Sequence, residues 1–341
     1  MLGGNNPFVF SILNIVYTTV TMYSQETIDQ IKHHIKTNAY AANYVEPTWY
    51  LITTLLFMFG LLYAIHITKG YSLSLILFLA LVMMRLFMIF HDMCHRSFYP
   101  TDERAKKEKG FNYQMASTIE HWCLFSASYW NNTHSTHHGA LGNLDEYDGT
   151  RTVFTSSEYD RLPEYQKVLY QIIRFPPVFF LLAPIYIYWL GRVIQGEWMY
   201  ITKYSLWLVV LYKLGNWKLL ISFLIAQYVG GILGIMMFHL QHQVNDGYWK
   251  HFDNTDPLLR SNADLSGSTV LTMPWFLEYF SNGIEYHNIH HIDPGIPSYN
   301  MKRTYYELVN RGLLKEDKVD YATEWASLWN TLYNEKTEKY E

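Results

Sequence analysis

The chain has 341 residues, of which half are hydrophobic and 17% aromatic, and its formal net charge at pH 7 is −4. This small negative charge and the lack of a long basic run exclude the electrostatic signature of a nucleic-acid-binding protein. Cysteine occurs only at Cys94 and Cys123, which excludes a disulfide framework and a four-cysteine zinc site. Because the mean hydropathy is near zero despite the apolar content, the hydrophobic residues must be concentrated in blocks.

The first two apolar blocks are long enough to cross a membrane. Residues 49–68 contain no Asp, Glu, Lys or Arg, and residues 71–90 contain one charge, Arg85. About 20 apolar residues in a helix span a hydrocarbon core of about 30 Å, so each block predicts a transmembrane helix. The connection through Lys69 and Gly70 is short, which predicts a helical hairpin.

Eight of the fifteen histidines fall into three clusters. Positions i, i+3 and i+4 share one face of a helix, so each cluster directs its imidazoles to one side. A histidine pair alone is common by chance, but three clusters in one membrane protein have no evident structural use. Imidazole suits iron, copper, nickel and zinc, and eight ligands exceed the coordination of one ion. The sequence therefore predicts two metal ions held almost entirely by nitrogen, with these ligands: His91, His95, His134, His137, His138, His287, His290 and His291.

The spacing H-x-x-x-H, H-x-x-H-H, H-x-x-H-H resembles the membrane-bound fatty acid desaturases. The strings HDMCHRSFY, HSTHHGALGNLD, FHLQHQVNDGYW and EYHNIHHIDPGIPSYN are similar to the acyl-lipid omega-6, or delta-12-type, branch of that family. The likeness extends over about residues 40–310. It implies two iron ions held by histidines, and a reaction that uses O2 and two electrons to introduce a cis double bond into an unactivated acyl chain.

The resemblance also implies a ninth histidine ligand, from the end of the last transmembrane helix. The chain offers His239 and His242 there, and the LQH string shared with related desaturases favours His242. His239 is then expected to be a hydrogen-bond partner of a ligand. The remaining histidines fit none of the patterns and are expected to be surface, interfacial or packed residues: His33, His34, His66, His121 and His251.

Three aspartates and a tryptophan are further candidates for the site. A ligating imidazole usually donates its other N–H to a carboxylate, carbonyl or water, which suggests Asp92, Asp145 and Asp148 as acceptors. Their alternative role is that of solvated loop or helix-capping residues. Trp130 lies one helical turn before His134 and is a candidate for lining an acyl tunnel, with an interfacial position as the alternative.

The ligands must meet on one side of the membrane, which constrains the topology. Residues 138 and 242 must be separated by an even number of crossings, yet three apolar stretches lie between them, at residues 175–191, 198–212 and 217–238. The first contains three prolines, so we expect it to lie along the interface or to break within the protein. The predicted fold is all-α, with four transmembrane helices in two hairpins (49–90 and roughly 198–238), interfacial helices and a polar cap that holds the di-metal site.

The expected organisation has three parts: an N-terminal polar or interfacial segment (1–48), a membrane-bound desaturase domain (49–310) and a C-terminal polar tail (311–341). Lysine and arginine are in excess on the side of the histidines, so the positive-inside tendency predicts a cytoplasmic active face. The membrane is expected to be either the endoplasmic reticulum or a prokaryotic inner membrane.

The expected partners are a fatty acyl lipid as substrate and an external electron donor. The chain has no H-P-G-G string of a fused cytochrome b5 domain and no cysteine set for an iron–sulfur cluster. A separate cytochrome b5 or ferredoxin is therefore expected to supply the electrons.

Two classes of alternative remain open. An acyl hydroxylase, epoxygenase or acetylenase would share the scaffold and the histidines, and only its product would differ. A histidine-rich metal transporter should place its ligands near the middle of its spans, and a zinc membrane hydrolase needs few protein ligands and an open position. Here the clusters follow the spans or lie outside them, which disfavours this second class.

Overall fold

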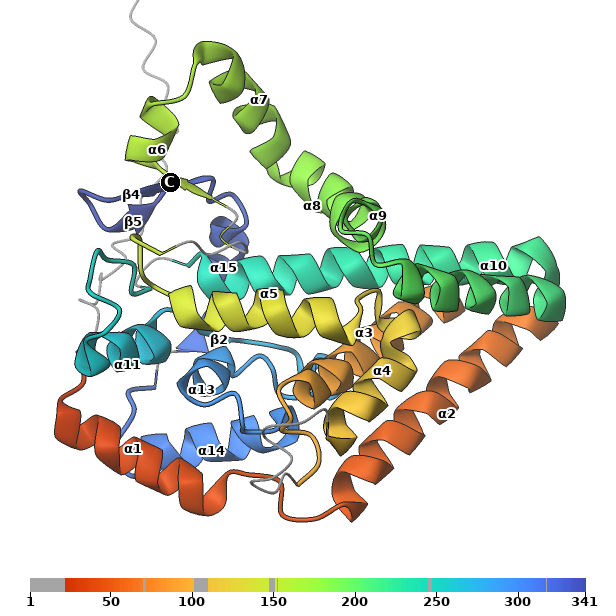
Figure 1. Ribbon diagram of the computed structural model, residues 1–341, viewed down its shortest axis with the longest axis horizontal. Helices are drawn as coiled ribbons and strands as arrows, with labels where there is room; N and C mark the ends of the chain where they lie inside the picture. Colours follow the sequence, from red (N-terminus) through yellow and green to blue (C-terminus); the bar gives the residue numbers. More distant parts are fainter. Residues whose placement is uncertain are drawn as a thin grey trace, which may run out of the picture.

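The computed structural model describes residues 22–69, 72–100, 110–146, 151, 153–244, 247–316 and 318–341. Within these ranges the protein is mostly helical, as predicted, and four helical segments are long and apolar enough to cross a membrane. These are α2 (Val45–Ile67), α3 (Leu73–Cys94), the stretch Pro176–Ile194 and α10 (Trp198–His242). The protein is therefore an integral membrane protein built around apolar helices (Figure 1).

Helices α2 and α3 form the first predicted hairpin. The Ser72 side chain accepts a hydrogen bond from the backbone N–H of Leu75, which caps the start of α3. Helix α3 is the more central of the two, since most of its second half is buried, whereas α2 exposes apolar side chains such as Leu56 and Tyr63. Exposed apolar side chains on a membrane helix face lipid, so α2 lies at the edge of the bundle.

Helix α10 is two helices joined by a sharp turn, which gives the second predicted hairpin. Asn216 has φ 58° and ψ −168°, values outside the helical region, and the chain doubles back there (Figure 1). Asn216 also accepts the backbone N–H of Lys218 through its side-chain oxygen, at 2.9 Å. Gly215 fits because a Cβ at this position would lie 2.5 Å from the Leu219 side chain. The two limbs of α10 and the α2–α3 pair are the four helices of the predicted hairpins.

The proline-containing stretch is an irregular helix. It consists of α8 (Pro176–Pro184), a π-helical turn η1 (Ile185–Leu190) and α9 (Gly191–Ile194). The π-helical turn, which is wider than an α-helical turn, begins directly after Pro184. Proline has no backbone N–H, so one hydrogen bond of the α-helix is absent there. The stretch packs on α10, with the Tyr228 hydroxyl donating to the Leu181 carbonyl at 2.8 Å (Figure 1). Its length and composition would also permit a crossing, so its interfacial position stays a prediction.

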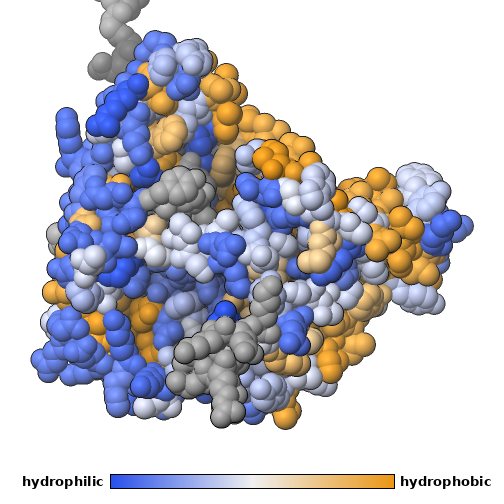
Figure 2. Space-filling model, viewed as in Figure 1, coloured by the Kyte–Doolittle hydropathy of each residue, from blue (hydrophilic) through white to orange (hydrophobic). Residues whose placement is uncertain are grey.

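The polar cap is made of short helices and two small sheets. The helices are α1 (Gln25–Asn38), α4 (Phe111–Cys123), α5 (Ala127–Ala140), α6 (Ser156–Asp160), α7 (Glu164–Arg174), α11 (Pro257–Ser266), α12 (Trp275–Ser281), α13 (His287–Ile292), α14 (Ser298–Asn310) and α15 (Tyr321–Ser327). One sheet has the order β1 (Phe154–Thr155), β4 (Leu332–Asn334), β5 (Lys339–Tyr340), and the other pairs β2 (Val270–Leu271) with β3 (Lys318–Val319) in parallel. Figure 2 shows hydrophilic residues over the cap side and hydrophobic residues along α8 and along the hairpins, with hydrophilic residues again at the α10 turn.

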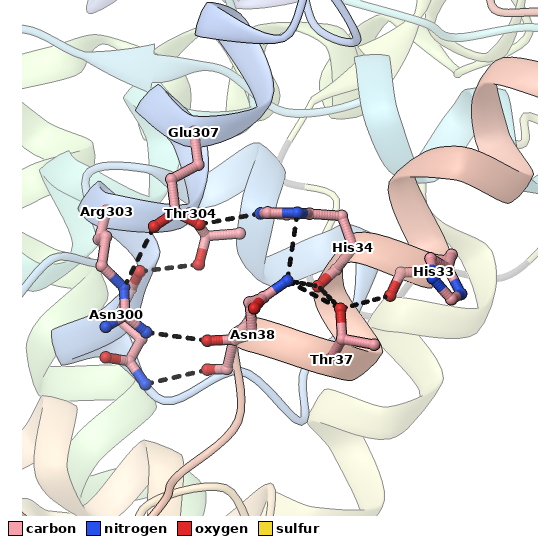
Figure 3. A network of polar contacts seen from close by, with 9 residues as sticks. His33, His34, Thr37, Asn38, Asn300, Arg303, Thr304 and Glu307 are labelled. Atoms are coloured by element: carbon pink, nitrogen blue, oxygen red, sulfur yellow. Dashed lines mark hydrogen bonds and ion pairs between the residues drawn. The ribbon is translucent and has the colours of Figure 1, made fainter.

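Both ends of the described chain are fixed to the cap. His34 of α1 contacts Glu307 of α14 at 2.9 Å, and the Arg303 guanidinium donates to the carbonyl of Asn38 at 2.9 Å (Figure 3). This second bond satisfies a carbonyl at the C-terminal end of α1, which has no partner within the helix. The C-terminal segment is also packed: the hydroxyl of Tyr340 donates to the carbonyl of His242 at 2.9 Å. The segment expected as a polar tail therefore covers the end of α10.

The two hairpins can be tested by cysteine accessibility. Ser135 lies on the exposed face of α5, and Lys213 lies at the opposite end of the bundle, beside the α10 turn. Each is replaced by cysteine in one variant, Ser135→Cys or Lys213→Cys. In sealed vesicles a membrane-impermeant thiol reagent should label only one of the two variants, and both should react after detergent is added. The parent protein is the control, because Cys94 and Cys123 are buried. Labelling of both positions from the same side would contradict the predicted hairpins.

Candidate metal centre

The three histidine clusters and the end of α10 come together at the boundary between the bundle and the cap. His91 is in the last turn of α3, and His95 caps that helix. The second cluster lies on α5, whose N-cap Ser126 accepts the backbone N–H of Tyr129, and the third lies on α13. Figure 1 shows α5 and α13 beside the end of α10. Four elements that are far apart in sequence therefore supply the imidazoles.

Eight of the nine predicted ligands fall into two groups of four. Within each group the potential ligand atoms all lie within 4.8 Å of one another. Each group draws on three elements, so neither could form from one helix alone. The first group consists of His91, His95, His134 and His290, and the second of His137, His242, His287 and His291.

The distances between ring nitrogens fit shared metal ions. The Nε2 atoms of His91 and His134 are 3.0 Å apart, and the Nε2 atom of His287 is 3.0 Å from that of His242 and 3.1 Å from that of His291. Two nitrogens bound at about 2.1 Å to one ion, at right angles, lie about 3.0 Å apart. The spacing within each group is thus that of neighbouring ligands on a single cation.

Two imidazoles of the first group carry ring nitrogens with no protein partner. Among the described residues, no hydrogen-bond partner reaches the Nε2 atoms of His95 and His290, although both atoms are buried. A buried polar atom without a partner is costly, and a bound cation would remove that cost. These unpartnered nitrogens are therefore a second observation that fits bound metal ions.

His138 belongs to neither group of four and lies between them. Its Nε2 atom is 3.2 Å from that of His134 in the first group. Its ring centroid is 4.6 Å from the His290 ring and 4.4 Å from the His291 ring, which belong to different groups. His138 consequently contacts rings of both groups.

The two histidines at the end of α10 point to different partners. His242 lies in the second group of four. The Nε2 atom of His239 instead contacts the carbonyl oxygen of Ser327, at 2.9 Å, and its ring packs 5.5 Å from that of Phe180. The histidines that the sequence left outside the clusters are in neither group.

Burial favours the protonation state that metal binding needs. The pKa of each imidazole on α13, and of His134 and His138 on α5, is lowered well below its ordinary value, mainly by desolvation and secondly by neighbouring histidines. These rings are therefore neutral at pH 7, and a neutral imidazole is the form that binds a metal. Neither group of four contains a carboxylate.

Asp92 is the aspartate that contacts a cluster histidine. Its Oδ1 atom is 3.2 Å from Nδ1 of His91, and its Oδ2 atom accepts both the backbone N–H and the hydroxyl of Ser298, at 2.7 and 2.6 Å. The carboxylate thereby fixes the ring of His91 and joins α3 to α14. Ser298 was not anticipated from the sequence, because nothing in its local pattern distinguishes it from an ordinary serine at the start of a helix.

The other predicted aspartates do not add to the centre. Asp145 is exposed, and its Oδ1 atom pairs with Nδ1 of His251 at 2.8 Å on the protein surface. The expectation that it orients a cluster imidazole is therefore not supported by its position. Asp148 lies outside the described residues.

Trp130 contacts both a cluster histidine and the aromatic side chains of the bundle. Its ring stacks on that of His134, with centroids 4.6 Å apart and planes at 22°, and it meets Phe87 edge to face at 5.1 Å. Phe87 also lines a small pocket with a cavity volume of about 30 Å³, about the volume of one water molecule. The pocket is lined from α3, α4, η1 and α10 by Met83, Met84, Phe87, Trp122, Cys123, Leu124, Tyr188, Gln227, Gly230, Gly231 and Gly234.

Comparisons with known proteins agree with this geometry. The family model described as fatty acid desaturase matches residues 70–325, well over half of the chain. The chain belongs to the fatty acid desaturase family. It is thus an O2-dependent oxidoreductase of lipid metabolism that acts on an acyl substrate, with buried histidine clusters able to bind metal.

Individual desaturases share about a quarter of their residues with this one. It is 28% identical over 273 residues to the fatty acid desaturase of Bacillus subtilis, an alignment that covers 74% of this chain and 73% of that protein. It is 25% identical over 244 residues to the sn-1 oleoyl-lipid 12-desaturase of Picosynechococcus sp., covering 64% and 63%. With the chloroplastic omega-6 fatty acid desaturase of Brassica napus the identity is 24% over 240 residues, covering 63% and 49%.

The role of Asp92 can be tested by its isosteric amide. Asp92→Asn replaces the carboxyl group that contacts Nδ1 of His91 with a weaker acceptor, so metal affinity should fall by about 10- to 100-fold, the usual effect of losing such a partner. Metal content after titration with a chelator measures this loss. Asp145→Asn is the matched control, because that carboxylate is exposed and pairs with His251. Equal chelator resistance in the two variants would contradict a role for Asp92 in holding the ligand.

Proposed function

We propose that this desaturase introduces a cis double bond of the delta-12, or omega-6, type into a membrane acyl lipid at a di-iron centre. The observation that carries the proposal is the pair of four-histidine groups, each spaced as neighbouring ligands of one ion. The delta-12 assignment is supported by the flanking strings of the histidine clusters and by two relatives, an oleoyl-lipid 12-desaturase and an omega-6 desaturase.

In this proposal nine histidines hold two iron ions. The first group and His138 hold one ion, and the second group, which includes His242, holds the other. An all-imidazole donor set suits divalent transition metals, and the requirement for O2 and two electrons favours iron over zinc, which has no redox chemistry. When bound, the two ions would activate O2, which takes up the two hydrogens of adjacent carbons together with two electrons and two protons and leaves as two water molecules.

The residues of the chain position the acyl chain and exclude water. An unactivated methylene has no polar group to recognise, so its position must be fixed by the shape of an apolar site. We infer that Trp130, which stacks on His134 and meets Phe87 edge to face, lines the acyl site beside the histidines. The reacting carbons then lie next to the histidines, and the apolar lining keeps competing water away.

Electrons come from a separate donor, cytochrome b5 or ferredoxin, that docks on the polar cap. The active face is cytoplasmic, in the endoplasmic reticulum or a prokaryotic inner membrane. The positive charges of the histidine side support this orientation. An acyl hydroxylase, epoxygenase or acetylenase remains the second candidate, because the same donor set and acyl site would serve those reactions on the same carbons.

The experiment that tests the proposal is a fatty-acid profile of yeast that expresses the protein, by gas chromatography with mass spectrometry. We expect a new diene such as linoleate, and its loss in His138→Ala. His251→Ala is the matched control and should retain the product, since His251 is exposed and outside both groups. A hydroxylated or epoxidised acid would favour the second candidate, and a product at another position would contradict the delta-12 assignment.

The identity of the metal is a separate prediction. Purified protein should contain about two iron atoms per chain by elemental analysis, as two groups of imidazoles require. His95→Ala, which removes a ligand of the first group alone, should lower the iron content toward one atom per chain. Zinc in place of iron, at full occupancy and with no product formed, would overturn the assignment.

A further inference from the structure

One of the short helices grouped with the cap carries an aromatic face that is open to its surroundings. Helix α12 (Trp275–Ser281) exposes three large side chains, those of Trp275, Phe276 and Tyr279, and Trp275 is 84% exposed. Positions i, i+1 and i+4 fall within an arc of about 100° on a helix, so the three side chains share one side of α12. A contiguous apolar face of this kind indicates contact with an apolar partner and not with water.

The neighbours of α12 are the membrane-crossing parts of the first hairpin. The ring of Tyr279 meets that of Phe57 edge to face at 6.4 Å, and the ring of Phe280 meets that of Phe78 at 5.5 Å. Phe57 lies in the middle of α2 and Phe78 in the first half of α3, whereas α3 carries its histidines at its other end. Both phenylalanines are exposed on the apolar surface of the hairpin, which faces lipid. The aromatic face of α12 is therefore continuous with a lipid-facing surface.

The charged side of α12 points toward the cap. The Nζ atom of Lys302, on α14, donates to Oε2 of Glu278 at 2.6 Å, and the Lys302 side chain is half exposed. Glu278 follows Phe276 by two residues, which places the two on roughly opposite sides of the helix. A helix with charge on one side and aromatic side chains on the other is typical of the bilayer interface, where tryptophan and tyrosine are enriched.

Arg85, the one charge within residues 71–90, joins α12 to the hairpin. Its Nε atom donates to Oγ1 of Thr54 on α2 at 3.1 Å, and its Nη1 atom donates to the carbonyl oxygen of Tyr279. The guanidinium carbon lies 4.2 Å from the centroid of the Tyr279 ring and 5.0 Å from that of Tyr50. A charge within a membrane span is costly, so these polar and cation–π contacts are needed to hold it there.

Arg85 and α12 depend on each other. The carbonyl of Tyr279 is in the last turn of α12, where carbonyl groups have no partner within the helix and a cation is favoured by the helix dipole. The guanidinium supplies the missing donor, and α12 in turn covers the guanidinium, so that Arg85 is only 2% exposed. Without α12 this charge would face lipid, which explains why an arginine is tolerated in the span.

The position of α12 is passed on to the third histidine cluster. Asn282 and Gly283 have φ values of 58° and 95°, which turn the chain sharply after α12, and α13 begins at His287. The hydroxyl of Ser281 donates to Oε2 of Glu285 across this connection, at 2.6 Å. Because the connection is short and braced, a displacement of α12 would also move α13.

We propose that α12 is a membrane-binding helix whose partner is the lipid bilayer. Its aromatic face lies against the acyl chains near the headgroups on the histidine side, and Arg85 fixes it to the hairpin at that level. The bilayer thereby helps to set the depth of the third histidine cluster. This inference depends on the membrane location of the hairpin and not on the reaction that the metal centre performs.

The test is a measurement of depth by electron paramagnetic resonance in phosphatidylcholine vesicles. A nitroxide is attached to Phe276→Cys on α12, to Leu56→Cys as a lipid-facing reference on α2, and to Ser135→Cys as a water-facing reference on α5. Collision rates are compared for oxygen, which concentrates in hydrocarbon, and for a water-soluble nickel chelate. The oxygen-to-nickel ratio at position 276 should exceed that at 135 and approach that at 56. The parent protein is the labelling control, because Cys94 and Cys123 are buried.

Two outcomes of this measurement would overturn the inference. A ratio at position 276 equal to that at 135 would place α12 in water. Low collision rates with both reagents would mean that protein covers the face, for example a second copy of the chain.

The role of Arg85 is tested by the mobility of the same label. Arg85→Met removes the charge at similar side-chain length, so the spectrum of the label at position 276 should show greater mobility, while that at position 56 should not change. Arg85→Lys keeps a cation beside the Tyr279 ring and should restore part of the immobilisation. If Arg85→Met does not fold, Tyr279→Leu, which removes the ring that faces the guanidinium, takes its place. Unchanged mobility would overturn the role of Arg85.

Discussion

The structure depends on the need to hold many neutral imidazoles close together and away from water. A buried ring nitrogen without a partner costs free energy, and a cluster of such nitrogens is tolerable only where a cation can be shared among them. The required rings come from four elements that are distant in sequence, and each element must return to the same end of the bundle. Two hairpins satisfy this requirement, because each brings the chain back to the side from which it entered.

Residues of the cap also hold the histidine-bearing helices in place through hydrogen bonds. Ser298 binds the carboxylate that contacts His91, so α14 fixes the orientation of a ring on α3. The Tyr340 hydroxyl binds the carbonyl of His242, and Ser327 offers its carbonyl to His239. The last part of the chain is therefore not a separate appendage, since its contacts converge on the end of α10.

The sequence predicts the apolar helices and the histidine positions well, because both depend on local patterns. Hydrophobic runs of about 20 residues and imidazoles at helical spacing can be recognised without knowledge of the tertiary structure. The division of the histidines into two groups could not be predicted, since His290 and His291 are adjacent in sequence yet belong to different groups. The π-helical turn, the small sheets and the Ser298 contact also depend on long-range packing, which leaves no local signature. Asp145 shows that a side chain close to a cluster in sequence need not lie at the site, because it pairs with His251 on the surface instead.

The unequal limbs of α10 have a consequence for where the reaction takes place. The second limb, residues 217–242, has 26 residues and rises about 39 Å, whereas the hydrocarbon core of a bilayer is about 30 Å thick. An upright limb of this length carries His242 beyond the lipid tails and into the headgroup region. If the substrate is the tail of a membrane lipid, as proposed, its reacting carbons must leave the hydrocarbon core to reach the histidines, so the protein replaces the surrounding lipid as their solvent. How readily a tail can be withdrawn from its neighbours, and hence the fluidity of the membrane, becomes part of the enzyme's working conditions.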